Sequence, residues 1–321
     1  LSLLEISHRI HAFVEIMDEA RDLSLELLGL SGNDYTSIFL QGGASSQFLM
    51  TAYNFLKNEA AFLDTGTWSK KAIKEAKLFG NVDVLASSEN DNYNHIPNFE
   101  IAKNYDYFHC TSNNTIFGTQ INSFPNTDNP IFCDMSSDIF SRALDFSKFD
   151  LIYAGAQKNL GPAGATLVVI KNDLLENIKD NVPSMMNYKV HADKSSMFNT
   201  PPVFSVYVSM LNMRWLKKMG GVSEIEKLNR KKAQLLYSEI DLNPLFNGHA
   251  REVDRSIMNA TFNLSDDNFK DSFETMLADA KITALSGHRS VGGYRASMYN
   301  AMSIDSVKVL VEVMSELESK I

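Results

Sequence analysis

The chain has no long apolar run. No stretch is apolar for the roughly 20 residues that a membrane-spanning helix needs, and the amino terminus has neither the basic segment nor the apolar core of a signal peptide. Hydrophobic residues make up 44% and charged residues 21% of the 321 residues, as in ordinary globular proteins. These absences predict a protein free in solution, without a membrane partner.

Cysteine is almost absent. Cys110 and Cys133 are the only two, and they are not spaced as a C-x-x-C pair, so neither a disulfide framework nor a thiolate zinc site is indicated. The H-E-x-x-H pattern is also absent, and we predict no metal site. Free thiols are typical of a reducing compartment, and we expect the protein in the cytoplasm.

An excess of basic residues is missing too. The formal net charge is -9, whereas a nucleic-acid surface needs a basic face to neutralise phosphates. We therefore predict no nucleic-acid partner. Against this acidic background, any local cluster of cations stands out as a candidate anion site.

Short apolar runs alternate with segments of helical periodicity at residues 44–57 and 69–79. The alternation predicts an α/β fold with a mostly parallel sheet, whose ligands collect at the carboxyl ends of its strands. The loops after Leu40, Asp64, Thr111, Asp134 and Gly155 are therefore the first candidates for a site. The predicted strands occupy residues 37–40, 60–65, 82–86, 105–111, 130–135, 150–155 and 165–170.

The chain is long enough for two lobes, because single hydrophobic cores stop growing near about 250–300 residues. We predict a large domain over residues 1–218 and a smaller α+β domain over residues 219–321. Paired glycines at Gly220 and Gly221 end a helix that begins near Val203 and mark the boundary. The smaller domain is predicted to contain helices over residues 223–242 and 306–320, with strands at residues 256–264 and 296–300.

The segment QGGASSQF at residues 41–48 follows a predicted strand and opens a predicted helix. Two glycines allow a tight turn, and free N–H groups at a helix N-terminus attract phosphate. The alternative is a capped helix after a glycine turn. The dinucleotide pattern G-x-G-x-x-G and the P-loop ending G-K-[ST] are both absent.

Three further residues follow predicted strands. Trp68 could stack on a planar ligand or pack as a helix-cap residue, and Thr115 could donate its hydroxyl to a ligand or belong to an ordinary turn. Asp134 ends a buried apolar strand, where a carboxylate is costly unless it meets a cation such as a protonated pyridine or caps a helix.

Lys158 follows another apolar strand among small residues, in IYAGAQKNLGPAG at residues 152–164. Partial desolvation lowers the pKa of a lysine and favours the neutral amine that forms a Schiff base, although a solvated turn lysine would have the same sequence. A phosphate loop, an aromatic ring, a buried aspartate and a lysine, each at a strand end, together indicate pyridoxal 5′-phosphate.

Two cationic clusters complete the pattern. His288, Arg289 and Arg295 lie in a glycine-bearing segment, and His8 and Arg9 lie near the amino terminus. Guanidinium groups suit bidentate binding of carboxylate or phosphate, so these residues predict a small substrate with several negative charges. Surface ion pairs are the alternative.

The chain resembles the phosphoserine aminotransferases, which belong to the class-V aminotransferases of pyridoxal-phosphate fold type I. The resemblance spans essentially the whole chain in family order. It rests on EISHR (5–9), GGAS (42–45), TGTWS (65–69), NNTIFGTQ (113–120), DMSSD (134–138), YAGAQKNLGPAG (153–164), NTPPVF (199–204) and GHRSVGGYRASMYNAM (287–302).

This resemblance implies a role for each matched residue. Lys158 would form the Schiff base, Asp134 would pair with the pyridine nitrogen, Trp68 would stack on the ring, and Thr115 would lie near the ring hydroxyl. A homodimer with shared active sites is also implied. The residues implied at the cofactor phosphate are Ala44, Ser45 and Gln157, with Asn199 and Thr200 reaching the phosphate of the partner subunit's cofactor.

The implied reaction is reversible transamination between O-phospho-L-serine and 2-oxoglutarate, giving 3-phosphohydroxypyruvate and L-glutamate in serine biosynthesis. Some relatives also accept 4-phosphohydroxy-threonine in vitamin B6 synthesis, and the sequence leaves this open. His8, Arg9, His288, Arg289 and Arg295 would bind the anionic groups of the substrate, without an assignment of arginine to anion.

Two departures and two rival functions accompany the resemblance. Some relatives have arginine at the position of Ser45, and the family has an N-terminal segment that we expect to precede Leu1. A cysteine desulfurase or selenocysteine lyase would have histidine before the lysine, where this chain has Gln157. A catalytically silent binding protein would not need Lys158 and Asp134.

Overall fold

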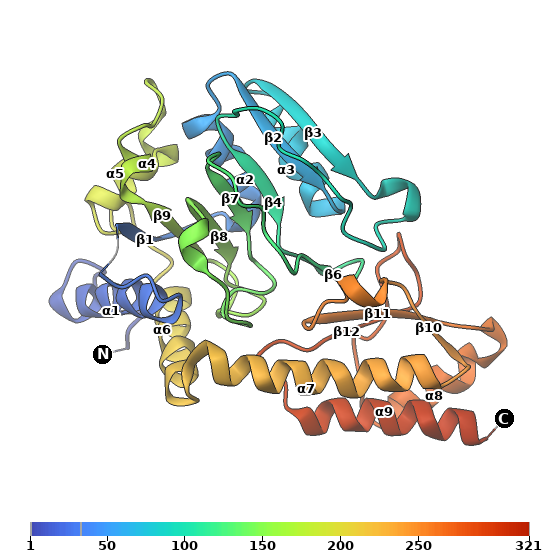
Figure 1. Cartoon of the computed structure of the whole chain (residues 1–321). Coiled ribbons are helices and arrows are strands. Elements are labelled where there is room, and N and C mark those ends of the chain that lie inside the picture. Colours follow the sequence, from blue (N-terminus) through green and yellow to red (C-terminus); the bar gives the residue numbers. More distant parts are fainter. Residues whose placement is uncertain (1, 33, 321) are drawn as a thin grey trace.

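The computed structural model describes residues 2–32 and 34–320. The outer limits of the two predicted domains, residues 1 and 321, lie outside the described residues. Helices cover both faces of a large sheet and one face of a small sheet (Figure 1). The described helices are α1 (His11–Leu27), α2 (Gly43–Phe55), α3 (Thr67–Ala76), α4 (Asn172–Leu175), α5 (Tyr188–Asp193), α6 (Val203–Lys218), α7 (Gly221–Leu242), α8 (Lys270–Asp279) and α9 (Ile304–Ser319).

The large sheet has seven strands in the order β1-β9-β8-β7-β4-β2-β3. Strands β8, β7, β4, β2 and β3 run parallel to one another, whereas β9 is antiparallel to both β8 and β1. The predicted α/β fold with a mostly parallel sheet is confirmed. Its strands are β1 (Tyr35–Leu40), β2 (Glu59–Asp64), β3 (Asn81–Ser87), β4 (Phe108–Thr111), β7 (Ile131–Asp134), β8 (Leu151–Gly155) and β9 (Thr166–Lys171).

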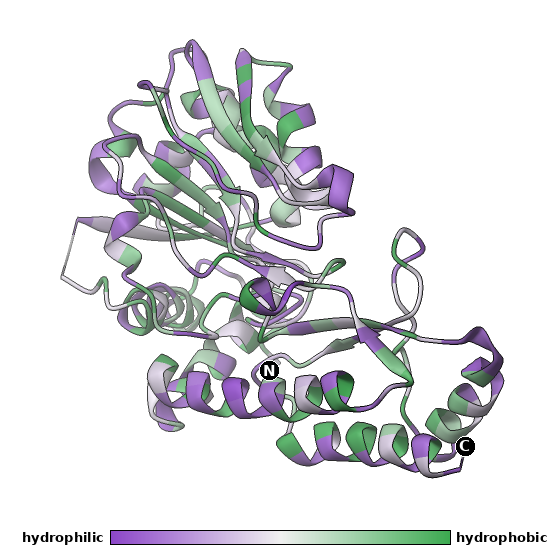
Figure 2. Cartoon of the chain, turned by 45° about the vertical axis from the view of Figure 1, so that its right-hand side comes forward, coloured by the Kyte–Doolittle hydropathy of each residue, from purple (hydrophilic) through white to green (hydrophobic). Residues whose placement is uncertain are grey.

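Alternate residues of these strands supply two hydrophobic cores. In β8, Leu151 and Tyr153 pack with α2, α3 and α5 on one face, while Ile152 and Ala154 pack with α1 and α6 on the other. Burial on both faces explains why the strands read as continuous apolar runs in the sequence. The same strands form the apolar interior of the larger lobe in Figure 2.

The smaller lobe contains a sheet in the order β10-β11-β12, covered by α7, α8 and α9. Its strands are β10 (Phe246–Gly248), β11 (Asn259–Leu264) and β12 (Tyr294–Ser297), and a separate two-stranded ribbon joins β5 (Asn113–Asn114) to β6 (Thr119–Gln120). Helix α7 runs alongside α9 (Figure 1).

The paired glycines end α6 as predicted, because Gly220 and Gly221 have φ of +99° and +78°, a region that favours glycine. Helix α7 then contributes to the cores of both lobes. Val222 and Ile225 pack in the large core, whereas Leu236 and Ile240 pack in the small one. The domain boundary after residue 218 stays a prediction.

None of the described helices is both long enough and apolar enough to cross a membrane.

His109 lies inside the large sheet as a neutral, fully buried residue of β4. Its ring stacks on Phe62 with 4.9 Å between ring centroids, and its Nε2 shares a hydrogen bond with the Tyr153 hydroxyl at 2.8 Å. Burial lowers the pKa of His109 from its usual 6.5 to about 3.

We expect His109 to make the folded state sensitive to acid. Below about pH 6.5 the unfolded chain binds a proton that folded His109 does not accept until the pH nears 3, so the free energy of unfolding falls by up to about 1.4 kcal/mol per pH unit. His109→Phe keeps an aromatic ring but removes the group that binds the proton. Urea unfolding between about pH 7 and pH 5 should therefore give a flatter profile for the variant, and parallel profiles would exclude His109 as the responsible group.

Candidate active site

The carboxyl ends of β1, β2, β4, β7 and β8 meet at one edge of the sheet, as the strand pattern predicts. Helix α2 begins just after β1, and α3 begins just after β2. Asp134 is the last residue of β7, and the segments that follow β2, β4 and β8 carry Trp68, Thr115 and Lys158.

Lys158, Trp68 and Thr115 lie close together. The Lys158 Nζ is 5.3 Å from the centroid of the Trp68 ring, and the Trp68 Nε1 donates a hydrogen bond of 3.2 Å to the Thr115 Oγ1. Lys158 is half-buried, Trp68 is half-buried, and Thr115 is buried. The structure thus brings Trp68 into contact with residues that are 47 and 90 positions further along the chain.

Asp134 is a buried carboxylate without a cationic partner in the described chain. Its Oδ1 accepts hydrogen bonds from the Ser136 N–H at 2.9 Å and the Ser136 hydroxyl at 2.6 Å. No described residue donates to Oδ2, and no described cation lies within ion-pair distance. Burial raises the pKa of Asp134, although Lys158 and Ser136 oppose the shift. A cation placed at this carboxylate would hold it in the ionised form.

Lys158 is poised toward the neutral amine. Burial lowers the pKa of its ammonium group, Asp134 opposes that shift, and Arg295 reinforces it. A neutral amine is the nucleophilic and proton-accepting form of lysine. The turn after β12 of the small lobe lies beside the lysine loop, because the Asn300 N–H donates to the Asn159 Oδ1 at 2.9 Å.

The start of α2 has the geometry of a helix N-terminus after a glycine turn, and its binding of an anion stays a prediction. Gly42 precedes the helix with φ of +92°, and the first N–H groups of α2 have no partner within the helix. A Cβ on Gly155 would lie 2.8 Å from the Gln157 Oε1 and 3.4 Å from the Ala44 N, so Gln157 and Ala44 approach each other over Gly155. Ser45 is exposed at the same helix start.

Asn199 and Thr200 lie beside this helix start in the same chain. The Gln41 side chain donates to the Thr200 carbonyl at 2.5 Å. Asn199, Gly42 and Ser46 line a cavity of about 260 Å³. The contact of Asn199 and Thr200 with a partner subunit stays a prediction.

The three residues of the carboxy-terminal cationic cluster differ in burial and in position. Arg295 is half-buried in β12, and its Nε is buried without a hydrogen-bond partner in the described chain. His288 is half-buried and Arg289 is exposed in the loop before β12. Val291 of that loop packs against the same small hydrophobic cluster as Trp68, which brings the loop near Trp68.

His8 and Arg9 are not brought together with Lys158 by any described contact. His8 is half-buried with its Nε2 unpartnered among the described residues, and Arg9 is exposed before α1. Their predicted role in substrate binding stays a prediction.

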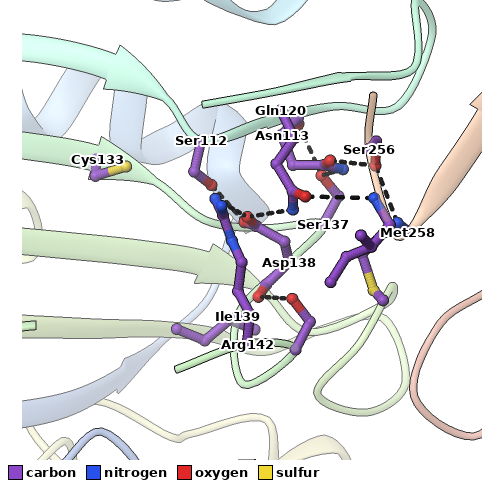
Figure 3. Close-up of polar contacts among 12 residues, drawn as sticks. Ser112, Asn113, Gln120, Cys133, Ser137, Asp138, Ile139, Arg142, Ser256 and Met258 are labelled. Carbon is purple, nitrogen blue, oxygen red and sulfur yellow. Dashed lines mark hydrogen bonds and ion pairs between the residues drawn. The ribbon is translucent and has the colours of Figure 1, made fainter. Parts of the chain in front are cut away.

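A buried ion pair behind Asp134 was missed in the sequence. The Arg142 Nη2 donates to the Asp138 Oδ2 at 3.0 Å, with side-chain exposures of only 4% and 1%. Ser112 and Gln120 also donate to the Asp138 carboxylate (Figure 3). The i,i+4 spacing of Asp138 and Arg142 was the available signal, but such a spacing usually indicates an exposed helical pair.

The comparisons with known proteins agree with this geometry. The profile of the family described as aminotransferase class-V matches residues 3–310, and the chain belongs to that family of enzymes. Within it, the chain is similar to phosphoserine aminotransferases. It is 62% identical over 324 residues to that of Flavobacterium psychrophilum, covering 100% of this chain and 91% of the relative, and 49% identical over 325 residues to that of Bacillus subtilis, covering 100% and 90%.

Solved structures show the same relationship. A phosphoserine aminotransferase studied for radiation damage of its Schiff base superposes with a TM-score of 0.96 at 44% identity, covering 100% of this chain and 91% of that chain. The PLP-bound phosphoserine aminotransferase of Trichomonas vaginalis gives a TM-score of 0.92 at 34% identity, covering 98% and 91%.

We expect the Asp138–Arg142 pair to be costly to break. Arg142→Met leaves a buried carboxylate without its cation, which should lower the free energy of unfolding by about 3–5 kcal/mol. Asp138→Asn combined with Arg142→Met should lose less than the sum of the single changes.

The matched control is Lys308→Met, which breaks the exposed Lys308–Asp305 pair and should cost under about 1 kcal/mol. Urea unfolding measures all four variants. Equal losses for Arg142→Met and Lys308→Met would contradict the structural importance of the buried pair.

Proposed function

We propose that this protein catalyses reversible transamination between O-phospho-L-serine and 2-oxoglutarate, with pyridoxal 5′-phosphate, as a cytoplasmic step of serine biosynthesis. The observation that carries the proposal is the position of the Lys158 Nζ over the Trp68 ring, at the sheet edge where buried Asp134 ends the neighbouring strand β7. Similarity to phosphoserine aminotransferases along the whole chain supports the choice of substrate.

The residues present fit pyridoxal phosphate. The Asp134 Oδ2, which has no hydrogen-bond partner among the described residues, offers an acceptor for a protonated ring nitrogen, and the N-terminus of α2 offers N–H groups for the phosphate. The ring face of Trp68 offers a stacking surface. When bound, the cofactor supplies a conjugated ring that takes up the electron pair left at the substrate α-carbon.

Lys158 would hold the cofactor covalently through Nζ. Once the amino substrate had taken its place, the free amine would accept the proton from the substrate α-carbon and pass it on to the cofactor side of the site. The lowered pKa of Lys158 keeps part of the amine population unprotonated for this task. Asp134 would favour a protonated ring nitrogen, because its carboxylate is buried and its Oδ2 has no hydrogen-bond donor among the described residues.

The other residues orient and enclose the reacting groups. Thr115, which already accepts from the Trp68 indole, would donate its hydroxyl to the ring hydroxyl of the cofactor. Ala44, Ser45 and Gln157 would hold the phosphate at the start of α2. Positioning of this kind contributes to rate because the reacting atoms are held in one geometry.

Arg295 would bind an anionic group of the substrate. Its buried, unpartnered Nε lacks an acceptor in the described chain, and a carboxylate or phosphate would supply one. We also propose contacts from His288 and Arg289 in the adjacent loop and from His8 and Arg9. A homodimer would place Asn199 and Thr200 of one subunit at the cofactor phosphate of the other.

The donor specificity tests the proposed function directly. O-phosphoserine or glutamate alone should convert bound pyridoxal phosphate to its pyridoxamine form, followed as a change in visible absorbance, whereas alanine should not. Lys158→Ala should abolish the visible band of the covalently held cofactor and lower turnover by about a hundredfold to ten-thousandfold. A colourless wild-type protein, or conversion by alanine alone, would overturn the proposal.

Arg295→Met should lower kcat/KM for O-phosphoserine by the equivalent of about 2–5 kcal/mol, because a desolvated charge pair with the substrate is lost. Arg289→Met should lower kcat/KM for O-phosphoserine by less, because Arg289 is exposed. Steady-state kinetics compare both with Arg251→Met, which removes an exposed contact to Asp91 and should leave kcat/KM unchanged. An unchanged kcat/KM in Arg295→Met would remove Arg295 from the substrate site.

A further inference from the structure

Asn113 lies buried at a junction of three chain segments, with 2% of its surface exposed. Its side-chain amide nitrogen donates to the Ser137 hydroxyl at 2.8 Å and to the Asn259 Oδ1 at 2.9 Å. Its side-chain oxygen accepts from the Ser256 hydroxyl, and Figure 3 shows these groups converging from both lobes. Both N–H donors of this one carboxamide are therefore used.

On the large lobe, Asn113 holds the segment that carries Asp134. The Ser137 hydroxyl donates back to the main-chain carbonyl of Asn113 at 2.8 Å, so the two residues are joined by two hydrogen bonds. The neighbouring Ser136 supplies both of the hydrogen bonds to the Asp134 Oδ1. The position of Asn113 is thus transmitted to Asp134 through adjacent residues.

On the small lobe, Asn113 holds the strands that carry Arg295. Asn259 pairs with Ser297 across β11 and β12, and Thr261 pairs with Arg295 two positions further on. The Asn259 side chain also donates to the Ser297 hydroxyl at 3.0 Å. Ser256 in turn accepts from the N–H groups of Met258 and Asn259, which fixes the entry into β11.

We propose that Asn113 is a positioning residue that sets the separation between Asp134 and Arg295, and with it the fit of the anionic substrate; this rests on the proposed transamination. Asp134 belongs to the cofactor side of the site and Arg295 to the substrate side, and they lie on different lobes. Rate depends on holding both in one geometry, because small displacements of reacting groups are costly.

Other contacts across the lobes should keep an Asn113 variant folded. The Thr261 hydroxyl donates to the Ile116 carbonyl at 3.2 Å, and the Asn300 N–H donates to the Asn159 Oδ1 at 2.9 Å. Loss of the Asn113 carboxamide therefore loosens the spacing of the two lobes while leaving them in contact.

The test compares Asn113→Ala with Asn243→Ala in the cofactor-loaded protein. Asn243 is an equally buried asparagine with three side-chain hydrogen bonds, to Glu239, Leu245 and Met314, within the small lobe. Both variants should lower Tm. Asn113→Ala alone should raise KM for O-phosphoserine by about tenfold, with affinity for pyridoxal phosphate, measured by absorbance titration, within about threefold of wild type.

Asn113→Asp gives a second variant of nearly the same shape. It replaces the N–H donors by an oxygen that faces the Asn259 Oδ1, and it should raise KM at least as much as Asn113→Ala. An unchanged KM in both variants, or an equal rise in Asn243→Ala, overturns the proposal while the proposed function stands. A loss of affinity for pyridoxal phosphate that accompanies the rise in KM also overturns the proposal, because it would indicate general damage to the site.

Hydrogen exchange of the cofactor-free protein provides a readout that does not depend on turnover. Asn113→Ala should speed exchange both in residues 134–138 and in residues 256–261, whereas Asn243→Ala should leave both segments unchanged. If the wild type does not convert O-phosphoserine, the proposed function is wrong. Faster exchange in both segments of Asn113→Ala would then still support the inference that Asn113 joins the two lobes. Exchange that rises in only one segment overturns it.

Discussion

The buried charge of Asp134 is the constraint on which the rest of the site depends. A carboxylate at the end of an interior strand is costly, and this one has only hydroxyl and N–H donors from Ser136 in the described chain. Burial disfavours the charged form of both groups, raising the pKa of Asp134 and lowering that of Lys158, while each of the two charges stabilises the other. Each group is therefore held away from its ordinary protonation behaviour, as is common at functional sites.

The structure around Asp134 is built to keep this arrangement in place. The Asp138–Arg142 pair lies immediately behind it, and Ser112 ties that pair to the segment after β4. Because Asp138 raises the pKa of Asp134, the neutralising partner Arg142 has an electrostatic role as well as a structural one. The network is satisfied at both Asp138 oxygens, whereas the buried Arg142 Nε has no hydrogen-bond partner in the described chain.

The position of Arg295 depends on contacts that hold the turn after β12. Lys232 of α7 is fully buried and donates to the carbonyls of Met298, Tyr299 and Met302, which follow β12. Asn300, in the same turn, binds Asn159 next to Lys158. The turn after β12 is thus hydrogen-bonded on one side to α7 and on the other to the loop that carries Lys158.

The sequence by itself determined the mostly parallel sheet and the places of Trp68, Asp134 and Lys158 at or just after its strand ends, because apolar periodicity and loop chemistry are local properties of a chain. Only the tertiary structure decided that β9 is antiparallel, that Arg295 acts on Lys158 while Arg9 makes no described contact with it, and that Asn113 joins the lobes. The physical reason is distance along the chain: a buried amide or carboxylate is satisfied by partners dozens of residues away, and nothing in its neighbouring residues identifies them.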